Sequence, residues 1–309
     1  MTPRRFVALS ALACFALAAA CVSPKPVASQ DTPAGRAGRV LLVSVDGMGQ
    51  EVAQRCEAPV LRALRERGSS TLAALTTNTA KTLPSHTAML TGVSPEKHGI
   101  DWNDAFHGYP KFPTLFEVVK RHRPELTTAM VAGKAKFATF TRPGALDWVF
   151  VPENDEAVDD EPLAQRAAAL VREHRPNVLM LHLPGVDRAG HASGWASPEQ
   201  CEAVAKADRA VGLVLDALRE VDLLDQTVVF ATADHGGFER THKPTDGKAM
   251  WIPWTVAGPG IRAGLDLSTV PGLQVHIEDT FATACWLLRV PLEATIDGRP
   301  VTSVRQDAP

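Results

Sequence analysis

The chain has 309 residues and a formal net charge of −3, and its composition is 45% hydrophobic and 22% charged. This is an ordinary globular composition, long enough for one large hydrophobic core or for a core with a small cap. Because the chain is not basic, we expect no nucleic-acid-binding surface on it.

The first residues carry the pattern of an export signal. Arg4 and Arg5 precede an apolar run that ends in small residues before Cys21. This run is too short and too rich in small residues for a spanning helix, so residues 1–20 are predicted to be a secretory signal peptide. The ending "AAAC" resembles a bacterial lipoprotein cleavage site, which predicts a lipid on Cys21 that anchors the protein to a membrane. Simple cleavage near the same place is the alternative.

Export would place the mature chain in an oxidising compartment, as a periplasmic or outer-membrane-anchored lipoprotein of a bacterium. Cys14 would leave with the signal peptide, whereas Cys56, Cys201 and Cys285 would remain. Since three is an odd number, at least one of them stays free or pairs elsewhere. None has metal-type spacing to another, so we expect buried small hydrophobic residues. Residues 21–38, rich in Pro, Ser, Ala and Gly, are predicted to form a flexible tether.

The body of the chain alternates apolar, β-branched runs with amphipathic patterns. The runs are typical of buried strands, and the patterns, in which apolar residues return every three or four positions, are typical of helices. Strands are predicted at 39–45, 127–133, 177–183, 227–233 and 251–258, and helices around 59–67, 84–91, 114–121, 161–174, 198–219 and 277–288. The alternation predicts an α/β fold, a mostly parallel central sheet with helices on both faces, in a single domain over residues 39–305.

Acidic residues and histidines follow three of the predicted strands. In chain order they are Asp46, then Asp187 and His191 in "DRAGH", and then Asp234, His235 and His242. In proteins with a parallel sheet, bound molecules lie beyond the carboxyl ends of the strands. We therefore expect these side chains to lie close together at that edge of the sheet. Carboxylates and imidazoles together suit Zn²⁺ and related divalent ions, and six ligands divide into two sites. Two metals about 4 Å apart can clamp both oxygens of an in-line displacement.

Thr82 begins the stretch "TLPSHTAMLTG" at the start of a predicted helix. Threonine commonly starts helices, so a plain helix cap is one interpretation. A hydroxyl bound to a metal would lose its proton far more readily than that of free threonine, and the N–H groups at a helix start favour an anion. We therefore interpret Thr82 as a metal-activated nucleophile.

Together these motifs resemble the alkaline phosphatase superfamily, and in particular its type I phosphodiesterase/nucleotide pyrophosphatase branch. "VSVDGMG", "TLPSHTAMLTGVSPEKHGI" with Asn103 shortly after, "DRAGH" and "ADHGG" stand in the family's order between residues 43 and 237. The resemblance implies an alkaline-phosphatase-like fold, two divalent metal ions, expected to be Zn²⁺, and a small phosphorylated substrate. The implied activity is the hydrolysis of phosphodiester or pyrophosphate bonds.

The resemblance also implies a role for each residue of these motifs. One metal would be held by Asp46, Thr82, Asp234 and His235, and the other by Asp187, His191 and a third histidine. Asn103 would donate a hydrogen bond to a phosphoryl oxygen. The phosphoryl group would pass to Thr82, and water on the second metal would hydrolyse the phosphothreonine.

The third histidine departs from typical nucleotide pyrophosphatases, in which it lies far downstream, after a long insertion. Here only "GGFERT" separates His235 from His242, a spacing similar to that of short relatives in the superfamily. His242 is therefore the predicted ligand, and His276 is the alternative.

Lys134 and Lys136, in "MVAGKAKFATF", follow the second predicted strand. Solvated lysines are the ordinary interpretation. The pair also resembles monoester phosphatases and phosphonoacetate hydrolases of the superfamily, because two cations suit a dianionic phosphoryl group better than a diester. A phosphomonoesterase or phosphonate hydrolase that uses both lysines to bind substrate is thus an alternative activity. A zinc- and phosphate-binding lipoprotein without turnover is the alternative of another class.

Sulfate transfer is disfavoured by the motif around Thr82. Sulfatases of the same superfamily use Cys or Ser in a motif that ends in Arg, whereas this chain has Thr82 and, four residues later, His86. We expect His86 and His98 to be structural residues that hold the nucleophile segment by hydrogen bonds.

Overall fold

A single sheet organises the chain in the computed structural model, which describes residues 38–154, 158–243, 245 and 247–307. Its strands are β1 (Arg39–Val45), β2 (Gly68–Leu75), β3 (Thr128–Ala132), β4 (Trp148–Phe150), β5 (Val178–Leu183), β6 (Thr227–Thr232), β7 (Trp251–Ala257) and β8 (Leu265–Asp266). They lie in the order β4-β3-β5-β1-β6-β7-β2-β8. β7 is antiparallel to both of its neighbours, and the other neighbouring pairs are parallel. The predicted α/β fold with a mostly parallel sheet is confirmed.

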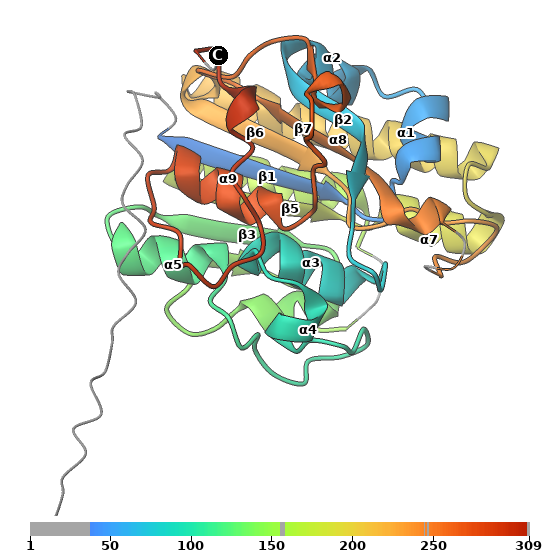
Figure 1. Cartoon of the computed structure of the whole chain (residues 1–309), viewed down its shortest axis with the longest axis horizontal. Coiled ribbons are helices and arrows are strands. Elements are labelled where there is room, and N and C mark those ends of the chain that lie inside the picture. The colour runs from blue at the N-terminus through green and yellow to red at the C-terminus, as the bar shows by residue number, and fades with distance from the viewer. Residues whose placement is uncertain (1–37, 155–157, 244, 246, 308–309) are drawn as a thin grey trace, which may run out of the picture.

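Helices cover both faces of this sheet (Figure 1). They are α1 (Gln50–Arg55), α2 (Pro59–Arg67), α3 (Thr82–Thr91), α4 (Pro95–His98), α5 (Leu115–His122), α6 (Asp160–His174), α7 (Gly185–Ser193), α8 (Pro198–Glu220) and α9 (Asp279–Leu287). Short 3₁₀ turns are η1 (Ala135–Phe140), η2 (Leu224–Gln226), η4 (Lys248–Met250), η5 (Leu267–Thr269) and η6 (Thr302–Val304). In Figure 1, α3, α5 and α9 lie in front of the sheet and α8 lies behind it.

The central strands are buried along almost their whole length because helices cover them on both sides. β1, β5 and β6 have buried residues at nearly every position, which explains their continuous apolar sequences. β1 lies between β5 and β6, so the carboxyl ends of three parallel strands meet at one edge. Side chains just beyond these three strand ends therefore lie close together, where ligands of such sheets bind.

Each predicted strand and helix is present, and the structure adds elements that the sequence patterns did not reveal. β2 ("GSSTLAAL") is built largely from small and hydroxyl residues, which lack the β-branched apolar signature of a buried strand. α7 follows β5 after Pro184, in a segment for which no helix was predicted. β7 runs antiparallel to β6 because the described residues between them form no α-helix that could carry the chain back across the sheet.

Two cysteines depart from the expectation of buried small hydrophobic residues. Cys56, which ends α1, and Cys201, in α8, form a disulfide across a sequence separation of 145 residues. Cys285 is a buried free thiol, as expected. The predicted signal peptide, Cys21 and the tether up to residue 37 lie outside the described residues. Within the described ranges, no helix has the length and apolar character needed to cross a membrane.

Candidate active site

One half of the candidate site comes from the ends of β1 and β6. Asp46 follows β1 directly, whereas Asp234 and His235 come just after β6, and all three side chains are fully buried. Gly47 adopts a left-handed turn, with φ of 73°, and donates its N–H to Asp234 Oδ1 at 3.1 Å. A Cβ on this glycine would lie 2.8 Å from the Asp187 Cα, so only glycine lets the two halves of the site approach this closely.

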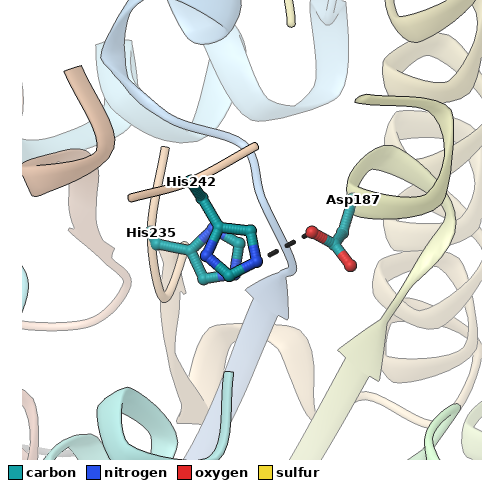
Figure 2. Close-up of side chains that lie close together, drawn as sticks. All are labelled: Asp187, His235 and His242. Atoms are coloured by element: carbon teal, nitrogen blue, oxygen red, sulfur yellow. Dashed lines mark ion pairs between the residues drawn. The ribbon is translucent and has the colours of Figure 1, made fainter. Parts of the chain in front are cut away.

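The other half comes from α7 and from the segment after β6. Asp187 and His191 are one helical turn apart on α7 and so share a face, with His191 Nε2 3.4 Å from Asp187 Oδ1. The His242 ring stacks on the His235 ring, with centroids 4.0 Å apart and planes at 17°. Figure 2 shows the two stacked rings facing the Asp187 carboxylate. The structure thus brings together the six carboxylate and imidazole side chains among the predicted metal ligands.

Hydrogen bonds to the backbone fix which nitrogen each of these histidines offers. Nδ1 of His191 bonds to the carbonyl of Arg240 at 3.0 Å, Nδ1 of His235 to that of Gly236 at 2.9 Å, and Nδ1 of His242 to that of Ala80 at 2.6 Å. A carbonyl only accepts, so Nδ1 carries the proton in each ring. Nε2 is then left with its lone pair, the arrangement usual for metal-binding histidines.

Four candidate ligand atoms are buried and have no hydrogen-bond partner among the residues that the structure describes. They are Asp46 Oδ1, Asp187 Oδ1, Asp234 Oδ2 and His235 Nε2. His235 Nε2 lies 3.4 Å from the Asp234 oxygen, 3.5 Å from that of Asp46 and 3.9 Å from that of Asp187. Ligands of a tetrahedral zinc ion are about 3.3 Å apart. Buried acceptors without partners are costly unless a cation joins them, so these residues fit a divalent metal.

The candidate ligands fall into two overlapping groups. Asp46, Asp234 and His235 form one group, and Asp187, His235 and His242 form the other. His235 belongs to both groups, although the sequence predicted it for one metal. His191 stands outside both but adjoins Asp187. His276, the alternative to His242, is exposed, pairs with Leu75 in an isolated β-bridge and belongs to neither group.

Burial and neighbouring charges set the protonation of the strand-end residues. Burial alone would raise the pKa of Asp46, but the Lys134 ammonium and a hydrogen bond from His182 outweigh it and hold this pKa well below its usual range. Burial and the neighbouring Asp46 charge raise the pKa of Asp234. Burial lowers the pKa of His235, and burial with the nearby His235 lowers that of His242 to about 4. Both histidines are therefore neutral ligands near pH 7.

Thr82 and Asn103 lie together at the start of α3. Thr82 is the first residue of this helix and only 2% exposed. Asn103 Oδ1 accepts the Leu83 N–H at 2.8 Å. This bond holds the Asn103 side chain next to Thr82 and leaves its NH₂ group as a hydrogen-bond donor. The predicted nucleophile and the predicted phosphoryl donor are thus held against the same helix start.

Neither predicted lysine is a solvated surface residue. The Lys134 ammonium is 2.7 Å from Asp46 Oδ2, 2.7 Å from Asp187 Oδ2 and 3.5 Å from Thr82 Oγ1. The Lys136 side chain is also buried, and its ammonium donates to the backbone carbonyl of Asn103. Lys134 therefore lies among the metal-ligand candidates, whereas Lys136 supports the loop that carries Asn103.

His182 is a site residue that the sequence patterns did not reveal. It lies inside β5, fully buried, and its Nδ1 accepts the Gly133 N–H at 3.3 Å. Its Nε2–H therefore donates to Asp46 Oδ2 at 2.9 Å and leaves Asp46 Oδ1 for a metal. The available signal was a lone histidine in the apolar run "VLMLHL". His86, by contrast, bonds to Ser44 Oγ and to the Thr82 carbonyl, as expected of a structural residue.

Comparisons with known proteins find relatives of the kind that the sequence motifs resemble. The family model for type I phosphodiesterase/nucleotide pyrophosphatase matches residues 40–245. Ectonucleotide pyrophosphatase/phosphodiesterase family member 1 of Homo sapiens is 28% identical over 216 residues, 63% of this chain and 23% of that protein. Family member 3 of Rattus norvegicus is 28% identical over 215 residues, 64% of this chain and 24% of that protein. The chain thus spans about a quarter of the length of these curated relatives.

Solved structures show the same fold at low sequence identity. Human ectonucleotide pyrophosphatase/phosphodiesterase 5 aligns with a TM-score of 0.70 and 14% identity, over 87% of this chain and 100% of that one. An inactive threonine-to-alanine variant of the murine protein, in complex with AMP, aligns with a TM-score of 0.67 and 14% identity, over 86% of this chain and 98% of that one. A 2-O GAG sulfatase aligns with a TM-score of 0.70 and 16% identity, over 86% and 74% of the two chains.

Proposed function

Because the chain belongs to the type I phosphodiesterase/nucleotide pyrophosphatase family, we propose that it hydrolyses phosphodiester or pyrophosphate bonds through a phosphothreonine on Thr82. The proposal depends above all on the four unpaired, buried ligand atoms that converge around His235 Nε2. They need a cation, and the Lys134 ammonium, which touches two of the same carboxylates, is 3.5 Å from the Thr82 hydroxyl. The candidate metal centre and the candidate nucleophile are therefore neighbours.

The chain's own residues would hold two divalent ions in this proposal. Asp46, Thr82, Asp234 and His235 would hold one, and Asp187, His191 and His242 the other. When bound, divalent ions would lower the pKa of the Thr82 hydroxyl and stabilise the negative charge on the phosphoryl group. The protein fixes the ligands beforehand, because the backbone carbonyls orient all three imidazoles and His182 orients Asp46.

Thr82 Oγ1, with its proton released to solvent, would attack the phosphorus in line with the leaving oxygen. The Oγ1–P bond forms as the bond from phosphorus to the leaving group breaks, and Asn103 holds a phosphoryl oxygen through its NH₂ group. Water then attacks the phosphothreonine, the Oγ1–P bond breaks, and the threonine hydroxyl is restored. In this scheme Lys136 is a positioning residue, since its ammonium holds the carbonyl of Asn103.

Relatives support the class of substrate and the type of nucleophile. The murine structure is described as an inactive threonine-to-alanine variant bound to AMP. A nucleotide phosphodiester or pyrophosphate is therefore the leading substrate class for this chain. The position of Lys134 favours a second candidate, a phosphomonoesterase, because an ammonium near Thr82 suits a dianionic phosphoryl group.

Parallel rate measurements on the zinc-loaded protein would test this proposal. An aryl phosphate diester and the matching monoester are compared for the wild type, Thr82→Ala and Thr82→Ser. We expect a diester preference, a loss of at least about 10³-fold in Thr82→Ala, and partial rescue in Thr82→Ser. A monoester preference would favour the second candidate. An unchanged rate in Thr82→Ala would refute the nucleophile assignment, and stoichiometric zinc without hydrolysis would favour a binding lipoprotein.

We also propose that the protein is exported and anchored through a lipid on Cys21. The Cys56–Cys201 disulfide supports export, because such bonds persist mainly in oxidising compartments. Incorporation of labelled palmitate into the wild type, but not into Cys21→Ala, is the expected result when the gene is expressed in a bacterium. Equal labelling of the two proteins, or none in either, would contradict the anchor.

A further inference from the structure

Lys134 stands where the two halves of the candidate metal site meet. It follows β3, and in the sheet order β5 separates β3 from β1, so its side chain reaches across the end of β5 to Asp46. The same ammonium contacts Asp187 at the start of α7. Its side chain is only 14% exposed. One cation thus joins a ligand of the strand-end half to a ligand of the α7 half.

The two carboxylates divide their oxygens in the same way. Oδ2 of Asp46 and Oδ2 of Asp187 each face the Lys134 ammonium at 2.7 Å. Oδ1 of each residue is buried, and no described residue forms a hydrogen bond with it. The lysine therefore satisfies half of each carboxylate, and the other half still requires a cation.

The balance of charge is incomplete with Lys134 alone. The cluster contains three carboxylates, those of Asp46, Asp187 and Asp234, against a single ammonium. Two positive charges are missing when all three carboxylates are ionised, and one divalent ion would supply them. A divalent ion and an ammonium that share the same two carboxylates also repel each other, because both lie in a buried region of low dielectric constant.

We propose that Lys134 is a built-in counter-cation that competes with metal for Asp46 and Asp187 and thereby weakens metal binding. The proposal rests on the proposed function in one respect only, in that it takes these two aspartates as metal ligands. In the metal-free protein, Lys134 holds the two halves of the site together. A metal bound at the two Oδ1 atoms would share both carboxylates with the ammonium and weaken their hold on it, so that the ammonium could turn to the neighbouring Thr82 and to an anionic substrate.

Direct measurement of zinc affinity tests this proposal without any assay of activity. Chelator-stripped wild type, Lys134→Met and Lys136→Met are titrated with zinc at pH 8 against a chromophoric chelator. Lys136→Met is the matched control, because Lys136 lies only two residues after Lys134 and its ammonium binds the Asn103 carbonyl. We expect Lys134→Met to bind zinc about tenfold or more tightly than the wild type, and Lys136→Met to match the wild type.

Thermal unfolding provides a second, independent readout. Without Lys134, the metal-free cluster has no ammonium between Asp46 and Asp187, so we expect its Tm to fall and the rise in Tm on adding zinc to grow. Lys134→Gln replaces the methionine variant if the latter does not fold, since an amide can still form hydrogen bonds but carries no charge. We expect the same two changes in Tm for Lys134→Gln.

The outcomes separate the two proposals. Equal or weaker zinc binding in Lys134→Met, with zinc bound by the wild type, would overturn the competition while the metal site stood. No zinc binding by any variant would refute both the metal site and the competition. Tighter zinc binding in Lys134→Met, together with no hydrolysis of any phosphoester by the wild type, would support the competition and refute the catalytic proposal.

Discussion

The two halves of the candidate site differ in how the protein holds them. In the strand-end half, Asp46, Asp234 and His235 are fully buried and follow two adjacent parallel strands. In the other half, the His191 side chain is 43% exposed, and His242 lies in the connection between β6 and β7, farther from the strand end than Asp234 and His235. Rigid placement and exclusion of water strengthen electrostatic interactions, so the strand-end half is expected to bind metal tightly and the α7 half to exchange it more readily.

Removing a ligand from the strand-end half is expected to have the largest effect. Asp46→Asn should lower kcat/KM by about 10³-fold, because a metal in such a site supplies several kcal/mol and about 1.4 kcal/mol is a factor of ten. Excess zinc should not restore the rate, since no water can replace a fully buried ligand. Steady-state rates at low and high zinc check this. Full recovery at high zinc would show that the two halves do not differ.

The α7 half is expected to tolerate the loss of a ligand better. His191→Ala should lower the rate only about tenfold at limiting zinc, because Asp187, His235 and His242 still surround that metal position. Most of the rate should return at high zinc, because water can occupy the exposed position. The same zinc titration measures both variants. A loss as large as that of Asp46→Asn, without recovery, would contradict the distinction between the halves.

The same difference determines how much the sequence could predict. Asp46 and Asp234 follow continuous apolar runs, and the carboxyl ends of parallel strands meet at one edge, so their convergence was predictable. The stacking of His242 on His235 depends on the path of a long connecting segment, which no periodicity reveals. The motif resemblance predicted the ligand, and the structure adds that His235 adjoins both groups.

Contacts between distant segments were beyond the reach of sequence patterns. Lys134 contacts Asp46 and Asp187 only because β3, β5 and β1 are neighbours in the sheet, an order that the strand patterns leave open. The Cys56–Cys201 disulfide joins segments 145 residues apart, and spacing alone could not distinguish it from other pairings. Local patterns thus predicted the elements and most of the candidate ligands, whereas strand order determined the interactions among them.

The smallest expected effect concerns Asp160, which supports the α7 half through the backbone. This residue begins α6 and accepts the Gly185 N–H at 3.0 Å, at the start of the helix that carries Asp187 and His191. Burial raises its pKa from 3.8 to about 6. The folded chain therefore binds this proton more tightly than the unfolded chain, and the free energy of unfolding falls as the pH rises from about 4 to 6.

Asp160→Asn removes this titration and keeps an oxygen acceptor for Gly185. The wild type should lose about 2 kcal/mol more stability than the variant between pH 4 and pH 6, since each pKa unit corresponds to about 1.4 kcal/mol. Urea denaturation of the metal-free proteins at the two pH values measures this difference, and the exposed Asp225→Asn serves as the control. Parallel pH profiles for wild type and Asp160→Asn would show that the carboxyl does not titrate in this range. The raised pKa of Asp160 would then be refuted, whereas its hydrogen bond from the Gly185 N–H would still hold the start of α7.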